Sequence, residues 1–175
     1  MPVAHVFALA GNPNSGKSTV FNAFTGARQR VGNWPGTTVE KKVGICRLEG
    51  YDIQVTDLPG AYSLTAYALE ERIARDHILE EQPDVVIDVV DAANLERNLY
   101  LAVQLVEAGI PLAIALNMSD VADTRGLHID AAQLSDGLQG VPVVRTVASK
   151  GEGIRQLLQA ALRAARAGRA QAEVA

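Results

Sequence analysis

Cysteine and long hydrophobic segments are scarce in this chain of 175 residues. Its one cysteine, Cys46, excludes a disulfide within the chain and suits a reducing compartment. The longest uninterrupted apolar run, Ile110 to Leu116, has seven residues even when its proline is counted, whereas a membrane-spanning helix needs about 20. The first residues, Met1 to His5, carry no basic cluster and therefore do not resemble a signal peptide.

An excess of positive charge is also absent. Lys and Arg number 16 and Asp and Glu number 20, which leaves a formal charge of −4. Such a chain is a poor candidate for broad electrostatic binding of nucleic acid, so no nucleic-acid partner is expected. With 48% apolar residues, a domain of this length buries roughly 70% of its unfolded surface without disulfides or metals. The composition predicts a soluble, cytosolic, single-domain protein.

Short apolar segments alternate with longer helical patterns along the chain. Val85–Ile87 and Ile110–Leu116 are apolar on both faces, which is typical of parallel strands covered on both sides. Leu95 to Val106 carries an apolar stripe of helical period. The alternation predicts an α/β fold with a six-stranded, mostly parallel sheet and helices on both faces. A turn at Glu49-Gly50 predicts a hairpin and one antiparallel edge strand. The expected strands span residues 4–10, 41–48, 51–57, 84–90, 110–116 and 141–146.

The C-terminal part of the chain repeats the helical pattern between Ile154 and Leu162. The Ala/Arg-rich sequence from Arg163 continues this pattern and then becomes low in complexity, which indicates a frayed end or a linker and not a basic patch. We therefore expect a domain over residues 1–165 and a C-terminal tail or linker over residues 166–175.

The segment Gly11 to Ser18 (GNPNSGKS) matches the phosphate-binding pattern G-x-x-x-x-G-K-[ST]. It follows an expected strand and precedes a helical stretch, which is the context that the pattern requires. Its glycines let successive backbone N–H groups turn toward a phosphate chain, and the following helix N-terminus adds a positive dipole. Lys17 is expected to reach the β- and γ-phosphates, and the Ser18 hydroxyl to ligate Mg²⁺.

A second motif, Asp57-Leu58-Pro59-Gly60, ends an expected strand of the hairpin. Ligands of doubly wound folds bind at the carboxyl ends of the strands, so a carboxylate there faces the phosphate loop. Asp57 is expected to hold Mg²⁺ through water, and the Gly60 N–H to contact a γ-phosphate. The residue after this glycine is Ala61, where Ras-like G domains carry a glutamine that orients the attacking water. Because an alanine side chain cannot orient water, slow intrinsic hydrolysis of bound GTP is expected.

Two later motifs concern the base. Asn117-Met118-Ser119-Asp120 resembles the N-K-x-D guanine-specificity motif of the GTPases, with Met118 in place of the lysine. The Asp120 carboxylate is expected to accept both N1–H and the exocyclic amine of guanine, and the apolar stem of Met118 to lie against the base. Val147-Ala148-Ser149-Lys150 resembles the S-A-K loop whose backbone supports the guanine O6, with Ala148 in place of the serine. Four motifs in this order predict a Ras-like P-loop GTPase fold.

Between the phosphate loop and the second expected strand lies Gly26–Val39 (GARQRVGNWPGTTV), which we call switch I. Such a loop must supply a threonine to Mg²⁺ and the γ-phosphate when GTP is bound, and Thr37 and Thr38 both qualify by chemistry. The combination of GNPNSGKST, TGARQRVGNWPGTTVEKKVG, TDLPGAYSL and NMSD resembles the N-terminal G domain of the bacterial ferrous iron transport protein B (FeoB) family, over residues 5 to about 160.

This resemblance implies several roles. It assigns the metal-binding threonine to Thr38, and it implies that Asn14, with backbone carbonyls near Gly32 and Trp34, coordinates K⁺ beside the phosphates. It also implies a GTPase that regulates or powers ferrous iron uptake from the cytoplasmic side of the bacterial inner membrane. The partner would be a membrane transporter region of the same polypeptide, of which this chain would be an excised domain or a short form. The alternatives are a soluble ribosome-assembly or tRNA-modification GTPase and a non-catalytic GTP/GDP sensor.

The site expected from the sequence binds GTP or GDP with Mg²⁺ and K⁺ as cofactors. The expected catalytic residues are Lys17, Thr38 and Asn14. The expected nucleotide-binding residues are Asn12, Asn14, Ser15, Gly16, Lys17, Ser18, Thr19, Gly60, Asn117, Met118, Asp120, Ala148, Ser149 and Lys150. The expected ligands are Ser18, Thr38 and Asp57 for Mg²⁺, and Asn14, Gly32 and Trp34 for K⁺.

Overall fold

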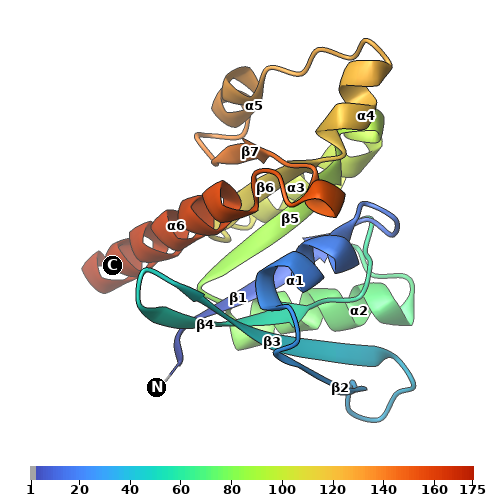
Figure 1. Cartoon of the computed structure of the whole chain (residues 1–175). Coiled ribbons are helices and arrows are strands. Elements are labelled where there is room, and N and C mark those ends of the chain that lie inside the picture. Colours follow the sequence, from blue (N-terminus) through green and yellow to red (C-terminus); the bar gives the residue numbers. More distant parts are fainter. Residues whose placement is uncertain (1–2) are drawn as a thin grey trace.

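The computed structural model describes residues 3–175 (Figure 1). Within these residues, seven strands form one sheet in the order β2-β3-β4-β1-β5-β6-β7. The strands β4, β1, β5, β6 and β7 are parallel neighbours, and β2 and β3 pair in antiparallel fashion at one edge. The predicted α/β fold with a mostly parallel sheet and an antiparallel edge is confirmed. The strands are β1 (Val3–Gly11), β2 (Gln29–Asn33), β3 (Glu40–Leu48), β4 (Tyr51–Asp57), β5 (Val85–Asp91), β6 (Leu112–Asn117) and β7 (Val143–Arg145).

The strand count of six is corrected to seven, because β2 was predicted to be part of the switch I loop. Its five residues are almost entirely exposed and show no apolar alternation, so nothing in their pattern indicates a strand. Backbone pairing with β3 holds β2 at the sheet edge. The predicted hairpin between β3 and β4 is confirmed, and both of its turn residues, Glu49 and Gly50, have positive φ (52° and 82°), as two-residue hairpin turns require.

Helices cover both faces of the sheet (Figure 1). On one face, α1 and α6 bury apolar side chains such as Phe21 and Leu157 against Ile87. On the other face, α2 and α3 pack residues such as Ala74 and Leu101 into a second core. The helices are α1 (Lys17–Thr25), α2 (Leu69–Asp76), α3 (Leu95–Glu107), α4 (Ser119–Thr124), α5 (Ala131–Gly137) and α6 (Ile154–Val174), with short turns η1 (His77–Glu81), η2 (Ala92–Asn94) and η3 (Ala148–Lys150). Among the helices of residues 3–175, none combines the length and apolar character needed to cross a bilayer.

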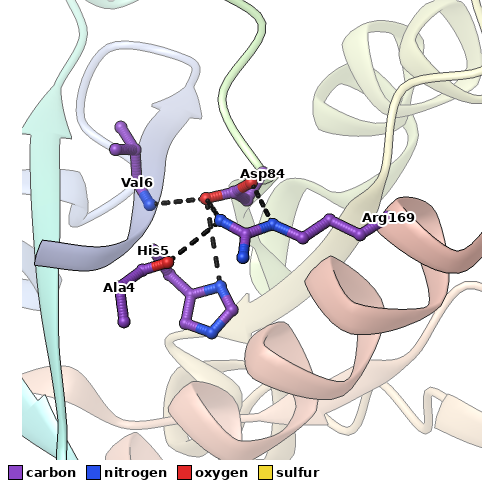
Figure 2. Close-up of polar contacts among 5 residues, drawn as sticks. All are labelled: Ala4, His5, Val6, Asp84 and Arg169. Atoms are coloured by element: carbon purple, nitrogen blue, oxygen red, sulfur yellow. Dashed lines mark hydrogen bonds and ion pairs between the residues drawn. The ribbon is translucent and has the colours of Figure 1, made fainter. Parts of the chain in front are cut away.

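The C-terminal helix α6 runs without interruption to Val174. The predicted boundary at residue 165 therefore lies inside a helix, and Arg169 beyond it contacts the sheet (Figure 2). The Arg169 guanidinium donates to both carboxylate oxygens of Asp84, at 2.8 and 2.9 Å, and to the Ala4 carbonyl at 3.0 Å. Burial alone would raise the pKa of Asp84, but the hydrogen bonds from Arg169 and the Val6 N–H lower it below its ordinary value.

Candidate nucleotide-binding site

The sequence motifs meet at one edge of the sheet. Strands β1, β4 and β6 end at Gly11, Asp57 and Asn117, and each of these residues belongs to a predicted motif. The three strands run in the same direction, so their carboxyl ends lie at the same edge, where ligands bind in folds of this kind. The loop that contains η3 follows β7 at that edge and brings Ala148 to Asn117.

The phosphate loop has the backbone shape that its glycines predict. Gly11 has φ 151° and Gly16 has φ 91°, and a Cβ at either position would overlap a neighbour, the Val89 carbonyl or the Asn117 amide. Asn14 also adopts a left-handed conformation, with φ 67°. Helix α1 begins directly after Gly16, so its N-terminal N–H groups point into the loop. A cleft of about 400 Å³ opens here and is lined by Asn12, Pro13, Asn14, Gly16, Lys17, Ser18, Thr19, Gly60 and Glu70.

The second motif is held against this loop. Lys17 Nζ lies 2.5 Å from Asp57 Oδ1, and both side chains are largely buried. The N–H of Ala61 donates to the Gly11 carbonyl at 3.0 Å. A Cβ on Gly60 would come within 2.9 Å of Pro13 Cγ, so only glycine allows this close approach. The carboxylate predicted to face Mg²⁺ is therefore in contact with the lysine predicted to reach the phosphates.

The Asn117 side chain connects the phosphate side of the site to the base side. Its Nδ2 donates to the Ser15 carbonyl at 3.0 Å. Its Oδ1 accepts from Thr146 Oγ1 at 3.0 Å and from the Ala148 N–H at 3.1 Å. Asn117 is 3% exposed, so these hydrogen bonds are shielded from water and fix the two loops relative to each other.

The remaining residues of the base motifs lie beside Asn117. Met118 caps α4 in a left-handed conformation (φ 56°), and its Cε comes close to Gly16. Asp120 Oδ2 lies 3.5 Å from Lys150 Nζ. Ala148 is buried, whereas Ser149 and Lys150 are exposed. A carboxylate and a flanking lysine thus stand at the rim where the guanine base is predicted to bind.

Switch I is not brought to the phosphate cleft. Gly32 lies in β2, three strands away from β1, which corresponds to roughly 14 Å. The Trp34 carbonyl accepts from the N–H and the Oγ1 of Thr37, both at 3.0 Å. Thr38 is exposed in the connection between β2 and β3. The predicted K⁺ ligands Gly32 and Trp34 are thus not assembled with Asn14 in this conformation.

Two residues of the site were not predicted from the sequence. Glu70 lines the phosphate cleft from the first turn of α2, although the charge pattern around it indicates only a solvated helix face. Thr146, directly after β7, donates its hydroxyl to the Asn117 amide oxygen, and no sequence motif marks a threonine at this position. The signal that could have found Thr146 is its position directly before the loop that resembles S-A-K.

This arrangement of phosphate loop, acidic D-x-x-G residue and base-side asparagine at one sheet edge defines the class of P-loop GTPases with a Ras-like G domain. Comparison with protein-family models is more specific. The model for ferrous iron transport protein B matches residues 5–161, and the chain therefore belongs to this family.

Relatives and solved structures agree with this assignment. The Fe(2+) transporter FeoB of Salmonella typhimurium is 53% identical over 153 residues, which cover 85% of this chain and 20% of the relative. This chain thus spans about a fifth of the length of the curated relatives it matches. The FeoB G-domain from Methanococcus jannaschii is 47% identical with a TM-score of 0.83, covering 94% of this chain and 99% of that one. A variant of S. thermophilus NFeoB bound to mGDP is 52% identical with a TM-score of 0.84, covering 90% of this chain and 60% of that one.

Proposed function

We propose that this chain is the GTP-binding and GTP-hydrolysing domain of a ferrous iron transporter. The observation that supports it best is the Asn117 side chain, which joins the phosphate loop to the base loop through three hydrogen bonds. Through these bonds the phosphate loop and the base loop form one continuous site, with Lys17 at the phosphate end and Asp120 at the base end. The relative from S. thermophilus was solved with mGDP bound, in agreement with a guanine nucleotide as the ligand.

At the phosphate end, the proposal gives each residue a distinct task. Lys17 binds the β- and γ-phosphates, and Ser18 and Asp57 hold Mg²⁺, for which hydroxyl and carboxylate oxygens are suitable ligands. When bound, Mg²⁺ neutralises charge that develops on the phosphate oxygens. Thr38 is exposed and outside the cleft in this conformation, so GTP must draw switch I toward the phosphates before Thr38 can bind.

The proposal also includes slow turnover and activation by K⁺. Ala61 is 2% exposed and its N–H already donates to Gly11, so residue 61 supplies no group that orients the attacking water. Asn14 lines the cleft in a left-handed conformation, which suits a side chain that coordinates a cation beside the phosphates. The carbonyls of Gly32 and Trp34 join it only after switch I has moved.

The curated relatives are named Fe(2+) transporters, and one solved relative is the cytosolic domain of L. pneumophila FeoB. In agreement with these relatives, we propose that this domain acts on the cytoplasmic side of the bacterial inner membrane. Its partner there is the transporter region of the same polypeptide, which it regulates or powers. Membership of the family favours this function over a soluble ribosome-assembly or tRNA-modification GTPase. A GTP/GDP sensor would bind the same nucleotides but would not hydrolyse GTP, so a turnover measurement distinguishes it from the proposed function.

Turnover of GTP in K⁺ and in Na⁺ buffers tests the catalytic part. We expect hydrolysis that requires Mg²⁺ and is at least about tenfold faster in K⁺, which corresponds to about 1.4 kcal/mol of transition-state stabilisation by the bound charge. Asn14→Ala should remove the difference and retain GTP binding, whereas Lys17→Ala should abolish binding or hydrolysis. Asn94→Ala, an exposed asparagine outside the cleft, is the matched control. Undetectable hydrolysis at saturating GTP in K⁺, with the membrane region present, would make the domain a sensor.

A further inference from the structure

Trp34, the one tryptophan of the chain, is buried although it lies in the otherwise exposed switch I. Its indole is 8% exposed and packs edge-on against the His77 ring, with centroids 5.5 Å apart and an interplanar angle of 76°. His77 follows α2 directly, and α2 follows the segment 60–68, which contains Gly60 of the phosphate cleft. One aromatic contact therefore connects switch I to η1, which lies at the far end of the helix that follows the segment 60–68.

The docked indole also fixes the position of Thr38. The backbone N–H of Trp34 donates to the Val39 carbonyl at 2.9 Å, and the Thr37 N–H donates to the Trp34 carbonyl at 3.0 Å. These bonds close the connection on both sides of Thr38. Lys41 Nζ lies 4.5 Å from the centroid of the Trp34 ring and holds the indole from the β3 side. In this conformation these bonds hold Thr38 in the connection between β2 and β3, outside the phosphate cleft.

Two features of the contact between the two rings favour its opening: unpaired buried nitrogens and an adjoining cavity. Trp34 Nε1 and His77 Nε2 are both buried and have no hydrogen-bond partner within residues 3–175, which costs free energy in the docked state. Burial and the nearby Lys41 lower the pKa of His77, so its ring is neutral at pH 7. A cavity of about 820 Å³ borders both side chains, so the rings are not enclosed by packing on all sides.

We propose that Trp34 and His77 form a latch that holds switch I away from the phosphate cleft, and that GTP binding has to open it. This inference rests on the proposed function. His77 acts on Thr38 through Trp34 and is therefore a positioning residue. Because GDP makes no γ-phosphate contact with Thr38, the latch lowers the affinity for GTP and leaves the affinity for GDP unchanged.

The test compares the dissociation constants of GDP and a non-hydrolysable GTP analogue, together with Trp34 emission. His77→Ala removes the ring partner of Trp34. We expect the ratio of the affinity for the analogue to the affinity for GDP to rise about three- to tenfold, the range that one aromatic pair accounts for. His77→Phe keeps an aromatic ring and should restore the wild-type ratio. His128→Ala, at an exposed histidine of the loop between α4 and α5, is the matched control. In the wild type, the analogue should shift the emission to longer wavelength and GDP should not.

The outcomes separate the latch from the function on which it rests. A ratio that rises in His77→Ala and returns in His77→Phe supports the latch. An unchanged affinity ratio in His77→Ala, or a Trp34 emission wavelength that does not change when the analogue binds, overturns the latch. Neither outcome contradicts nucleotide binding. If neither nucleotide binds the wild-type protein, the proposed function itself fails and the latch falls with it.

Discussion

Replacing Asn117 by alanine is the perturbation whose effect follows most directly from the site geometry. The change removes three hydrogen bonds and leaves the Ser15 carbonyl and the Ala148 N–H without that partner. At about 1 kcal/mol for each lost bond, the free energy of unfolding should fall by roughly 3 kcal/mol. A domain of this size has about 5–15 kcal/mol in total, so the variant should still fold at room temperature.

Two assays on Asn117→Ala test this reasoning. Urea unfolding without nucleotide measures the stability loss, and titration with a fluorescent GDP derivative measures binding. Because the Asn117 amide fixes the phosphate loop relative to the base loop, affinity should fall even under conditions in which the variant is fully folded. Asn94→Ala, which removes a single exposed hydrogen bond to Asp91, should lower the free energy of unfolding by at most about 1 kcal/mol and leave the GDP affinity unchanged. A folded Asn117→Ala protein with wild-type stability and wild-type GDP affinity would refute the structural role that we assign to this side chain.

Three further variants test other parts of the account. Asp120→Asn should weaken the binding of guanine nucleotides and favour the binding of xanthine nucleotides in a competition assay, because the base-side carboxylate is exchanged for an amide. Burial raises the pKa of Asp88 to about 7 from 3.8, so the folded state holds its proton more tightly and stability falls as the pH rises from about 4 to about 7. Asp88→Asn should therefore stabilise the domain by up to about 4 kcal/mol above pH 7, and hardly at all near pH 4, in urea unfolding. Arg169→Ala should cost about 1–2 kcal/mol at pH 7. This cost should persist at pH 4 and shrink only as the pH falls through the pKa of Asp84, which lies below its ordinary value of 3.8.

Each of these variants has an outcome that would contradict its premise. An unchanged preference for GTP in Asp120→Asn would remove this residue from the base site. Equal stability changes at pH 5 and pH 8 in Asp88→Asn would show that the carboxyl of Asp88 titrates normally. A neutral effect of Arg169→Ala at pH 7 would mean that the C-terminal turns of α6 do not depend on the contact in Figure 2.

The parts of the structure that the sequence predicted well depend on local patterns. The phosphate loop was predictable because Gly11 and Gly16 stand at fixed spacing before a lysine and after an apolar strand. The parallel sheet was predictable because segments such as Val85–Ile87 are apolar on both faces.

The parts that it did not predict depend on contacts between distant residues. The Trp34 indole is docked on His77, 43 positions further along the chain. Strand β2 forms through backbone pairing with β3 and carries no apolar pattern of its own. Arg169 was expected to lie in a tail or linker, and its contact with Asp84 spans 85 positions. No local pattern encodes such pairs, because neither partner is unusual among its neighbours in the sequence.

Competition binding with the purified domain tests whether the carboxyl edge of the sheet holds a guanine-nucleotide site. A fluorescent GDP derivative is bound in the presence of Mg²⁺, and GTP, GDP and ATP are then added in turn as competitors. We expect GTP and GDP to displace the probe completely, whereas ATP at the same concentrations should not. Displacement by ATP as effective as that by GTP, or a probe that never binds, would contradict it.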